Sequence, residues 1–349
     1  MPNDYQNPSL SPAAAMNRVF EDSIEYLQAP PKTRTLANLV QAGRVRIGTT
    51  KDLEWVVSTG EPTAEGIGIY AASNLQSNST SVPAKLSMGT KRIAHRFAIS
   101  RIEMRQAASR GVGALRDLLG MHFQEALDSI MVKISNAIQN NDASTEIVSL
   151  SAVLDQTAAY AGIDPAVVTR WIPLVNTNGT PRAFNRDLMI DFDAYIETFG
   201  RAYDRAWMHP NTEVRYRKLF MDLAGAASLP NYTNIGQLKG ADLGLGASSY
   251  NGMPIIKEPV LPEGEIRMTR LANMELFFFD LDMGANPQPG MPRAIDEVVN
   301  NSLGFPIRIC SYPITVPTQL QFEFYTVCQL RVRNRQDAMA IKNLTTTDW

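Results

Sequence analysis

A long run of alternating side chains lies near the end of the chain. Every second position is mainly apolar: Leu320, Phe322, Phe324, Thr326, Cys328, Leu330 and Val332. The intervening positions hold Gln321, Glu323, Tyr325, Val327, Gln329, Arg331 and Arg333. A period of two over this length predicts a β-strand about twice as long as an ordinary one. We expect it to be the central strand of its domain and to pack one face on a long helix.

That helix is predicted earlier in the chain, where the spacing of apolar side chains changes to intervals of three and four. The positions are Leu115, Leu118, Leu119, Phe123, Ala126, Leu127, Ile130, Ile134, Ala137 and Ile138. Asn140 and the polar residues after it end the pattern. Counted from Glu103, the helix is roughly three times the mean length, although Gly111 and Gly113 can interrupt its first part. Such a helix predicts a flat or elongated domain.

Residues 44–96 form a polar stretch with short β-type patches. Large apolar side chains are scarce in it, and residues 66–84 carry no charge. If its two halves pair as a hairpin, each arm has about 26 residues and reaches up to about 85 Å. The radius of gyration of a compact chain of this length is about 20 Å, so the hairpin would project from the globule. Two interpretations remain open: an arm that lies across another subunit, and a disordered loop.

The remaining pattern mixes helices and strands. Helices are predicted at 12–27 within a proline-punctuated N-terminal arm, and at 150–161, 186–203 and 211–223; strands are predicted at 253–257 and 274–281; loops are predicted at 225–252 and 284–293. The arm helix docks either on its own domain or on a neighbouring subunit. Because strands and helices do not alternate regularly, the fold class is α+β rather than a doubly wound parallel sheet.

Charge and composition exclude several classes of protein. With 33 Lys and Arg against 35 Asp and Glu, the net charge of −2 argues against a dedicated nucleic-acid binder. The sequence has no apolar run long enough to cross a membrane and no signal-peptide pattern, so we expect a protein that is neither membrane-bound nor exported. Cys310 and Cys328 would face each other across a hairpin centred near residue 319, but two buried thiols are favoured over a bridge.

Motifs for chemistry are missing. The chain has no phosphate-binding loop, no complete dinucleotide fingerprint and no Gly-x-Ser-x-Gly elbow. Asp187 and Asp191 share a helix face suited to Mg²⁺, but acidic residues in a first turn also simply complement the helix dipole, which we favour. We therefore predict no catalytic, cofactor-binding or metal-binding residues, and no enzyme.

Three arginines follow one face of the last strand. Arg331, Arg333 and Arg335 offer either a sequence-blind contact with nucleic-acid phosphates or a solvated face with ion pairs to a neighbour.

Several stretches, taken in order, carry a family resemblance. They are Trp171–Arg182 leading into a helix from Asp187 to Phe199, Trp207-Met-His-Pro210 opening the next helix, Tyr250-Asn-Gly-Met-Pro-Ile255, and Leu330-Arg-Val-Arg-Asn334 before a short segment at 338–344. With the order of elements, the sequence resembles the major capsid proteins of tailed bacteriophages, which have the Hong Kong 97 fold, over about residues 40–345.

The resemblance implies a domain map. It places an N-terminal arm at 1–43, an extended β-hairpin loop at 44–98, a peripheral domain with the spine helix at 99–185, an axial domain at 186–305, and a return to the peripheral domain at 306–349. Interface residues are expected in and beside the extended loop, at Trp55, Tyr70, Lys85 and Arg92.

The implied function is self-assembly into pentamers and hexamers of an icosahedral virion shell around double-stranded DNA. Assembly takes place in the host cytoplasm, with scaffold, portal and cement proteins as further partners. One alternative is the shell of an encapsulin-like nanocompartment. Another, from a different class, is a small-molecule hydrolase or binding protein whose loop at 44–96 is a lid.

Overall fold

The computed structural model describes residues 34–48, 52–58, 81–87, 92–140, 147–198, 203–226, 249–250, 253–279, 293–299, 307–311 and 319–345. These residues form two compact units. Unit 1 contains Met1–Lys51, Met88–Val148 and Glu275–Leu330, and unit 2 contains Asp52–Ser87, Ser149–Met274 and Arg331–Trp349. Among the described residues, no helix is long and apolar enough to cross a membrane.

The helices are α2 (Arg34–Gln41), α3 (Arg101–Arg110), α4 (Val112–Gln139), α5 (Leu150–Val153), α6 (Arg186–Thr198) and α7 (Pro210–Ala226), with short 3₁₀ turns η4 (Thr169–Trp171), η6 (Leu271–Asn273) and η7 (Arg335–Asp337). The strands are β1 (Val45–Gly48), β2 (Asp52–Ser58), β3 (Ser81–Ser87), β4 (Arg92–Ser100), β5 (Leu174–Asn176), β6 (Arg205–Met208), β7 (Ser249–Tyr250), β8 (Met253–Lys257), β9 (Ile266–Thr269), β10 (Met274–Phe279), β11 (Arg293–Val299), β12 (Ile307–Ser311), β13 (Gln319–Val332) and β14 (Ala338–Ile341). The structure is therefore α+β, as predicted.

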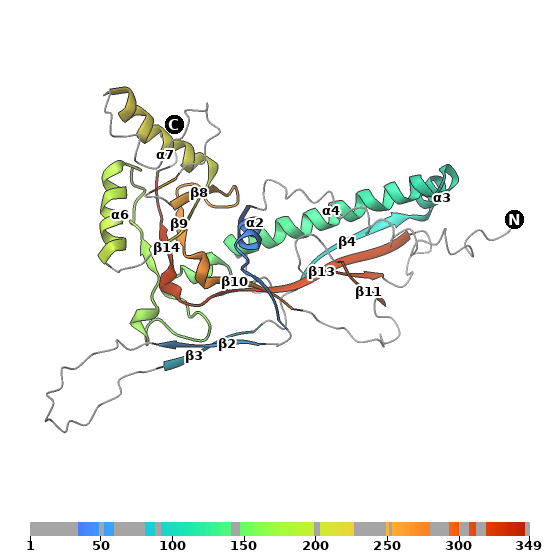
Figure 1. Ribbon diagram of the computed structural model, residues 1–349, viewed down its shortest axis with the longest axis horizontal. Coiled ribbons are helices and arrows are strands. Elements are labelled where there is room, and N and C mark those ends of the chain that lie inside the picture. Colours follow the sequence, from blue (N-terminus) through green and yellow to red (C-terminus); the bar gives the residue numbers. More distant parts are fainter. Residues whose placement is uncertain are drawn as a thin grey trace, which may run out of the picture. The chain divides into compact units, whose positions relative to one another are not determined.

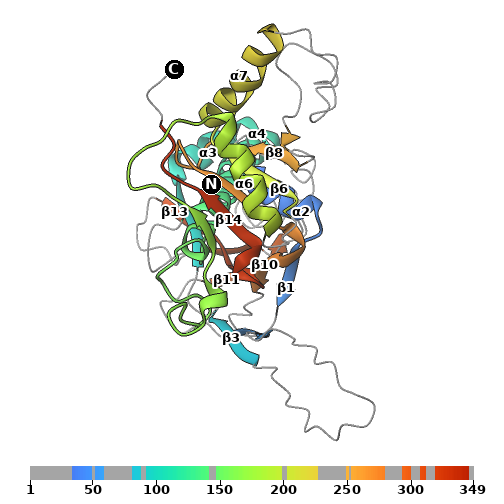
Figure 2. The ribbon, with the colours of Figure 1, turned by 90° about the vertical axis from the view of Figure 1, so that its left-hand side faces the viewer.

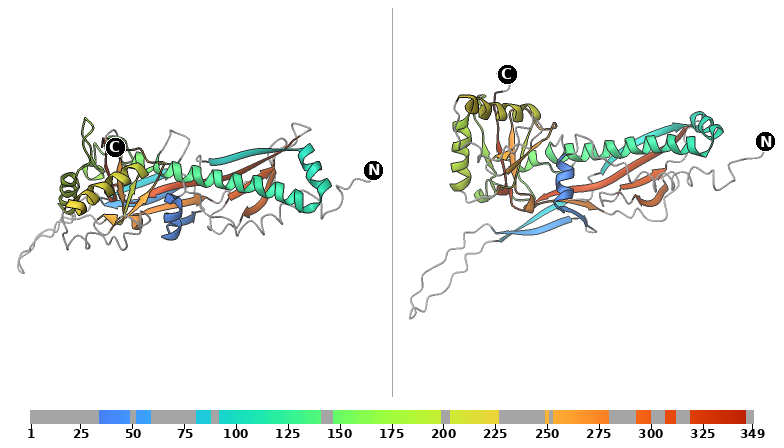
Figure 3. Two further views of the ribbon diagram at one scale, coloured as in Figure 1. Left: turned by 90° about the horizontal axis from the view of Figure 1, so that it is seen from above. Right: turned by 45° about the horizontal axis from the view of Figure 1, so that its top comes forward.

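Unit 1 is built on the predicted long strand. Its sheet has the order β1-β10-β13-β12-β11, and β4 also pairs with β13. The antiparallel β4–β13 register runs from Gln319↔Ser100 to Val327↔Arg92. As Figures 1 and 3 show, β13 and α4 run alongside each other through unit 1. The prediction of a central strand is confirmed.

Aromatic rings fill the layer between α4 and the sheet. Phe123 of α4 lies 5.2 Å from Phe324 and 6.2 Å from Phe322, measured between ring centroids. Phe97 of β4 stacks on His122 of α4 at 6.0 Å. Because alternate residues of a strand point to the same face, the even-numbered side chains of β13 supply this layer. The predicted packing of one strand face on the long helix is confirmed.

The predicted interruption of the long helix lies at Gly111. Its φ of 118° separates α3 from α4, in a region of backbone conformation that favours glycine. Ser100 begins α3 with a capping box completed by Glu103, and α4 ends at Asn140 as predicted.

Unit 2 is built on a second six-stranded sheet, with the order β5-β14-β9-β6-β8-β7. Its core includes Ala206, Met208, Ile266, Met268, Met339 and Ile341, and Leu188 and Ile196 of α6 pack against it. Phe184 stacks on Tyr216 of α7, with ring centroids 6.3 Å apart. Figure 2 shows α6 in front of β14, on one side of this sheet.

The predicted hairpin is shorter than expected. β2 and β3 pair antiparallel from Asp52↔Ser87 to Ser58↔Ser81. This register is centred near residue 70, as predicted. The predicted pairing of the two outer parts of the hairpin with each other is wrong. β1 pairs instead with β10, and β4 pairs with β13, both in unit 1. β1 and β4 pair within the six-stranded sheet of unit 1, whereas pairing with each other would leave a two-stranded ribbon in water.

Two other predictions need correction. The helix at 150–161 is only the single turn α5, and Gly162, its predicted end, instead belongs to a turn with φ of 78°. The predicted domain map stays a prediction; unit 2 includes residues 149–185 and 331–349. Cys310 does not face Cys328 across a hairpin, because it lies opposite Glu323. The favoured free, buried thiol is confirmed for Cys328, and burial raises its pKa to about 12. The predicted helix at 12–27 lies outside the described residues.

Candidate subunit-interface site

The β2–β3 hairpin has one buried and one exposed face. Leu53, Ala84 and Leu86 point inward and are buried, whereas Val56 on the opposite face is 70% exposed. The exposed face also carries Lys85, whose Nζ lies 2.8 Å from a carboxylate oxygen of Asp52 and 3.3 Å from one of Glu54. The hydrogen bond to Asp52 is the main cause of a raised pKa at Lys85.

The hairpin is fixed to the rest of unit 2 at two points. The indole Nε1 of Trp55 donates to the carbonyl oxygen of Arg333 at 3.0 Å, and its ring lies 6.5 Å from that of Tyr160. The backbone N–H of Lys85 donates to the carbonyl oxygen of Ala161 at 2.9 Å. Ala161 has a φ of 55°, which is uncommon for a residue other than glycine. We call Trp55, Tyr160, Ala161 and Arg333 the hairpin root.

Tyr160 joins the hairpin root to the last residue of β13. Its hydroxyl accepts the backbone N–H of Val332 at 2.8 Å and lies 3.2 Å from the carbonyl oxygen of the same residue, to which it donates. The indole N–H of Trp171 donates to the carbonyl oxygen of Tyr160 at 3.1 Å. Burial raises the pKa of Tyr160, so its phenol remains neutral and keeps both hydrogen bonds.

Arg335 holds the loop that carries Tyr160. The guanidinium is buried and donates to the carbonyl oxygens of Val153 at 2.6 Å and Ala158 at 2.9 Å, and also to that of Asp155. Burial lowers the pKa of Arg335, while the neighbouring Asp155 carboxylate acts in the opposite direction. Backbone carbonyl oxygens therefore replace most of the solvent around this cation.

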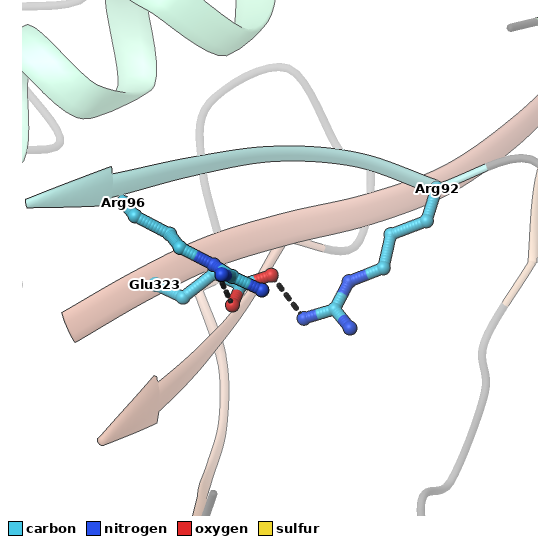
Figure 4. A network of polar contacts seen from close by, with 3 residues as sticks. All are labelled: Arg92, Arg96 and Glu323. Atoms are coloured by element: carbon cyan, nitrogen blue, oxygen red, sulfur yellow. Dashed lines mark hydrogen bonds and ion pairs between the residues drawn. The ribbon is translucent and has the colours of Figure 1, made fainter. Parts of the chain in front are cut away.

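Unit 1 contains a second buried charge, on the face of β13 turned away from α4. The Glu323 side chain is 1% exposed and lies between Arg92 and Arg96 of β4 (Figure 4). One Glu323 oxygen accepts from Arg92, and the other accepts from the Arg96 Nε at 2.8 Å. The Arg92 guanidinium also lies 4.2 Å from the ring centroid of Tyr325. This cluster fixes β4, the strand that leads into α3 and α4.

The chemistry available at these sites is binding and positioning. In the ranges that the structure describes, no group of three or more His, Cys, Asp or Glu side chains is arranged to hold a metal ion. Tyr160, Arg335 and Glu323 are each occupied by internal hydrogen bonds. The surfaces that remain for binding a partner are therefore the exposed hairpin face and the helices of unit 2.

Solved structures of capsid and encapsulin chains have a similar fold. A chain of the cyanophage A-1(L) capsid asymmetric unit superimposes with a TM-score of 0.70 and 20% identity, over 90% of this chain and 93% of that one. The chain has a capsid-protein fold. The capsid of a native GTA particle matches with a TM-score of 0.54 and 13% identity, over 90% of this chain and 91% of that one. The holo-SrpI encapsulin complex from Synechococcus elongatus matches with a TM-score of 0.54 and 10% identity, over 92% and 90%. No protein-family model and no curated protein matches the sequence.

Each described residue of the predicted interface has its own surroundings within its unit, and its role between subunits stays a prediction. Trp55 points inward to the hairpin root, Lys85 lies on the exposed face, and Arg92 belongs to unit 1. Tyr70 lies outside the described residues. Trp55 and the guanidinium of Arg92 thus make contacts within the chain. Of the three described residues, only Lys85 is on the exposed hairpin face.

The predicted arginine stripe is wrong for Arg335. The strand β13 ends at Val332, and Arg335 lies in the turn η7 with its guanidinium buried against carbonyls. Arg331 lies with its guanidinium 5.8 Å from the ring centroid of Trp55, and Arg333 is exposed. The chain leaves the strand before the third arginine, so the three residues do not share one face.

Sequence reasoning missed Tyr160, Arg335 and Glu323 as structural residues. Glu323 did carry a signal, because an acidic residue in the middle of an apolar strand needs a cationic partner when both faces are buried. The alternation of apolar and polar residues suggested one solvated face instead. Tyr160 and Arg335 carried no such local signal, since their partners are distant backbone groups.

Replacing Trp55 by Ala should loosen the hairpin root. The variant loses the Nε1 hydrogen bond to Arg333 and the ring contact with Tyr160, which together are worth about 2 kcal/mol. We expect backbone amides of β2 and β3 to exchange at least about tenfold faster, measured by hydrogen exchange. Val56→Ala on the exposed face is the matched control and should leave exchange unchanged. Equal exchange in both variants would contradict the assigned anchor.

Proposed function

We propose that this chain is the major capsid protein of a tailed bacteriophage, with the Hong Kong 97 type of fold. It assembles into pentamers and hexamers of an icosahedral virion shell around double-stranded DNA, in the host cytoplasm. The extended loop comprises residues 44–98, the peripheral domain residues 99–185 and 306–349, and the axial domain residues 186–305. The observation that carries this proposal is the match to the cyanophage capsid chain over nine-tenths of both chains, with a TM-score of 0.70.

The hairpin supports the same function. Its root is fixed within unit 2, yet one face remains exposed, with Val56 70% exposed beside the ion-paired Lys85. A two-stranded ribbon is marginal alone in water, and a neighbouring subunit would cover that face. Many weak contacts repeated around a closed shell give a stable assembly.

A nanocompartment shell is the second candidate, and the encapsulin match favours it. Its TM-score of 0.54 is below the 0.70 of the cyanophage capsid chain, so we place the phage head first. The contents of the particles distinguish the two: a phage shell encloses DNA, with Arg333 as a sequence-blind phosphate contact, whereas a compartment encloses protein cargo.

The test is light scattering of the purified chain over a concentration series, with negative-stain microscopy of the same fractions. We expect hollow particles in the megadalton range. A chain that remains monomeric at every concentration, and also with candidate scaffold proteins, would overturn the proposal and favour the enzyme with a lid loop.

A hairpin variant sharpens this test. Ser58 and Ser81 form the last described pair, so residues 59–80 can be replaced by the two-residue turn Asn-Gly without changing the β2–β3 register. We expect a folded variant that no longer forms shells. Normal particles from this variant would show that assembly does not need residues 59–80.

A further inference from the structure

The helix α6 has a second face that the core of unit 2 does not use. Leu188 and Ile196 pack against that core. On the other side, exposed residues recur at intervals of three and four and so form one stripe along the helix: Asp187, Ile190, Asp191, Ala194 and Tyr195. Ile190 is 52% exposed and Tyr195 is 36% exposed. We call these five residues the α6 stripe; it combines exposed apolar side chains with negative charge.

The helix α7 carries a stripe of the opposite sign. Thr212, Glu213 and Tyr216 face inward and are buried, while Asn211, Val214 and Lys218 are exposed and lie along one face. The Glu213 carboxylate lies 2.7 Å from the guanidinium of Arg217 and 3.4 Å from the Nζ of Lys257.

Because its acidic residue is turned inward, the outer side of α7 over its first two turns is left basic and apolar. We call Asn211, Val214 and Lys218 the α7 stripe. Val214 is 38% exposed, and Arg215 flanks the stripe on the same side of the helix.

The two stripes lie on different parts of the same unit. Figures 1 and 3 show α6 beside the sheet of unit 2 and α7 across the end of that sheet. Two unlike patches on one subunit that fit each other make a head-to-tail contact between copies. Such a contact closes into a ring when the rotation between subunits permits it, whereas a two-fold contact uses one patch twice.

We propose that the α6 stripe of one copy docks on the α7 stripe of the next copy within a ring of subunits. Asp187 and Asp191 face Lys218, and Ile190 and Tyr195 cover Val214. A second copy is the occupant that fits, because the complementary charge and the complementary apolar side chain are both present on the same chain. This inference rests on the proposed shell function and names the contact inside its rings.

Charge reversal tests the pairing. Asp191→Lys alone and Lys218→Glu alone each place like charges together, so we expect each to weaken assembly at least about tenfold. The double variant D191K/K218E restores opposite charges and should recover most of the loss. The readout is the particle fraction by analytical ultracentrifugation over a concentration series, at low and at high salt. Added salt should lessen the defect of each single variant, because it screens exposed charges.

Glu125→Lys is the matched control, since it makes the same charge change at an exposed position of α4 in unit 1. It should assemble like the wild type. Circular dichroism and thermal unfolding check that each variant folds; if K218E does not, Lys218→Met removes the charge and should still weaken assembly.

The outcomes separate the two proposals. Wild-type particles together with normal particles from both single variants would overturn the stripe contact and leave the shell function standing. Loss in both single variants without recovery in the double variant would also overturn the pairing. A wild-type chain that stays monomeric at every concentration, with and without scaffold candidates, would overturn both proposals.

Discussion

Arg335→Met is expected to lower the free energy of unfolding by about 3–5 kcal/mol. The guanidinium is fully buried and donates to the carbonyl oxygens of Val153, Ala158 and Asp155. Methionine fills part of the volume but donates no hydrogen bond, so these carbonyls lose their partner in a place that water does not readily reach. Denaturant unfolding followed by fluorescence gives the measurement.

Arg333→Met is the matched control for this prediction. Arg333 is exposed, and the substitution keeps its backbone carbonyl, which accepts from Trp55, and its backbone N–H, which donates to the carbonyl oxygen of Asn273. A change within about 0.5 kcal/mol is expected. Arg335→Lys should recover only part of the loss, because an ammonium group cannot match the spread of a guanidinium. Equal unfolding midpoints for R335M and R333M would contradict the assigned role.

The second large effect is expected at Glu323, and it is asymmetric. Removing both cations with Arg92→Met and Arg96→Met leaves a carboxylate that is 1% exposed without its two arginines, at a cost of about 3–5 kcal/mol. Glu323→Gln alone should cost about 1 kcal/mol, because the arginine side chains are 36% and 70% exposed and regain water.

The triple variant R92M/R96M/E323Q tests the cause of that asymmetry. If the loss of both arginines beside a buried carboxylate is responsible, replacing Glu323 by Gln in the double Met background should restore most of the stability. The free energies of unfolding of the four proteins form a cycle that isolates the interaction. A triple variant no more stable than R92M/R96M would show that the arginines act through packing alone, for example through the contact of Arg92 with Tyr325.

Local patterns were reliable wherever one element buries a continuous face. The alternation from residue 320 to 332 corresponds to β13 (Gln319–Val332), and the helical spacing that ends at Asn140 corresponds to α4. Gly111 was a usable signal for the break between α3 and α4 because its conformation is one that other residues rarely adopt. The strand at 253–257 was predicted with its observed bounds.

Errors arose where a partner far away in sequence decides the outcome. Residues 44–48 and 92–98 were predicted to pair with each other, but β10 and β13 are their partners. The register of β12 on β13 places Glu323, not Cys328, opposite Cys310. Hydrophobic spacing contains no information about such pairing, since a β-strand presents the same edge to any suitable neighbour.

The same distinction between local patterns and distant partners applies to the candidate sites. The sequence by itself determined that the chain is α+β, that a long helix packs on a long strand, and that a polar hairpin is centred near residue 70, because each of these depends on the order of apolar and polar side chains within one segment. Only the tertiary structure decided that Arg335 is buried on carbonyls while Arg333 is exposed, and that α6 and α7 present opposite charges on their outer faces. The physical reason is that burial and pairing of a charged side chain depend on groups supplied by distant segments, which come together only when the chain has folded.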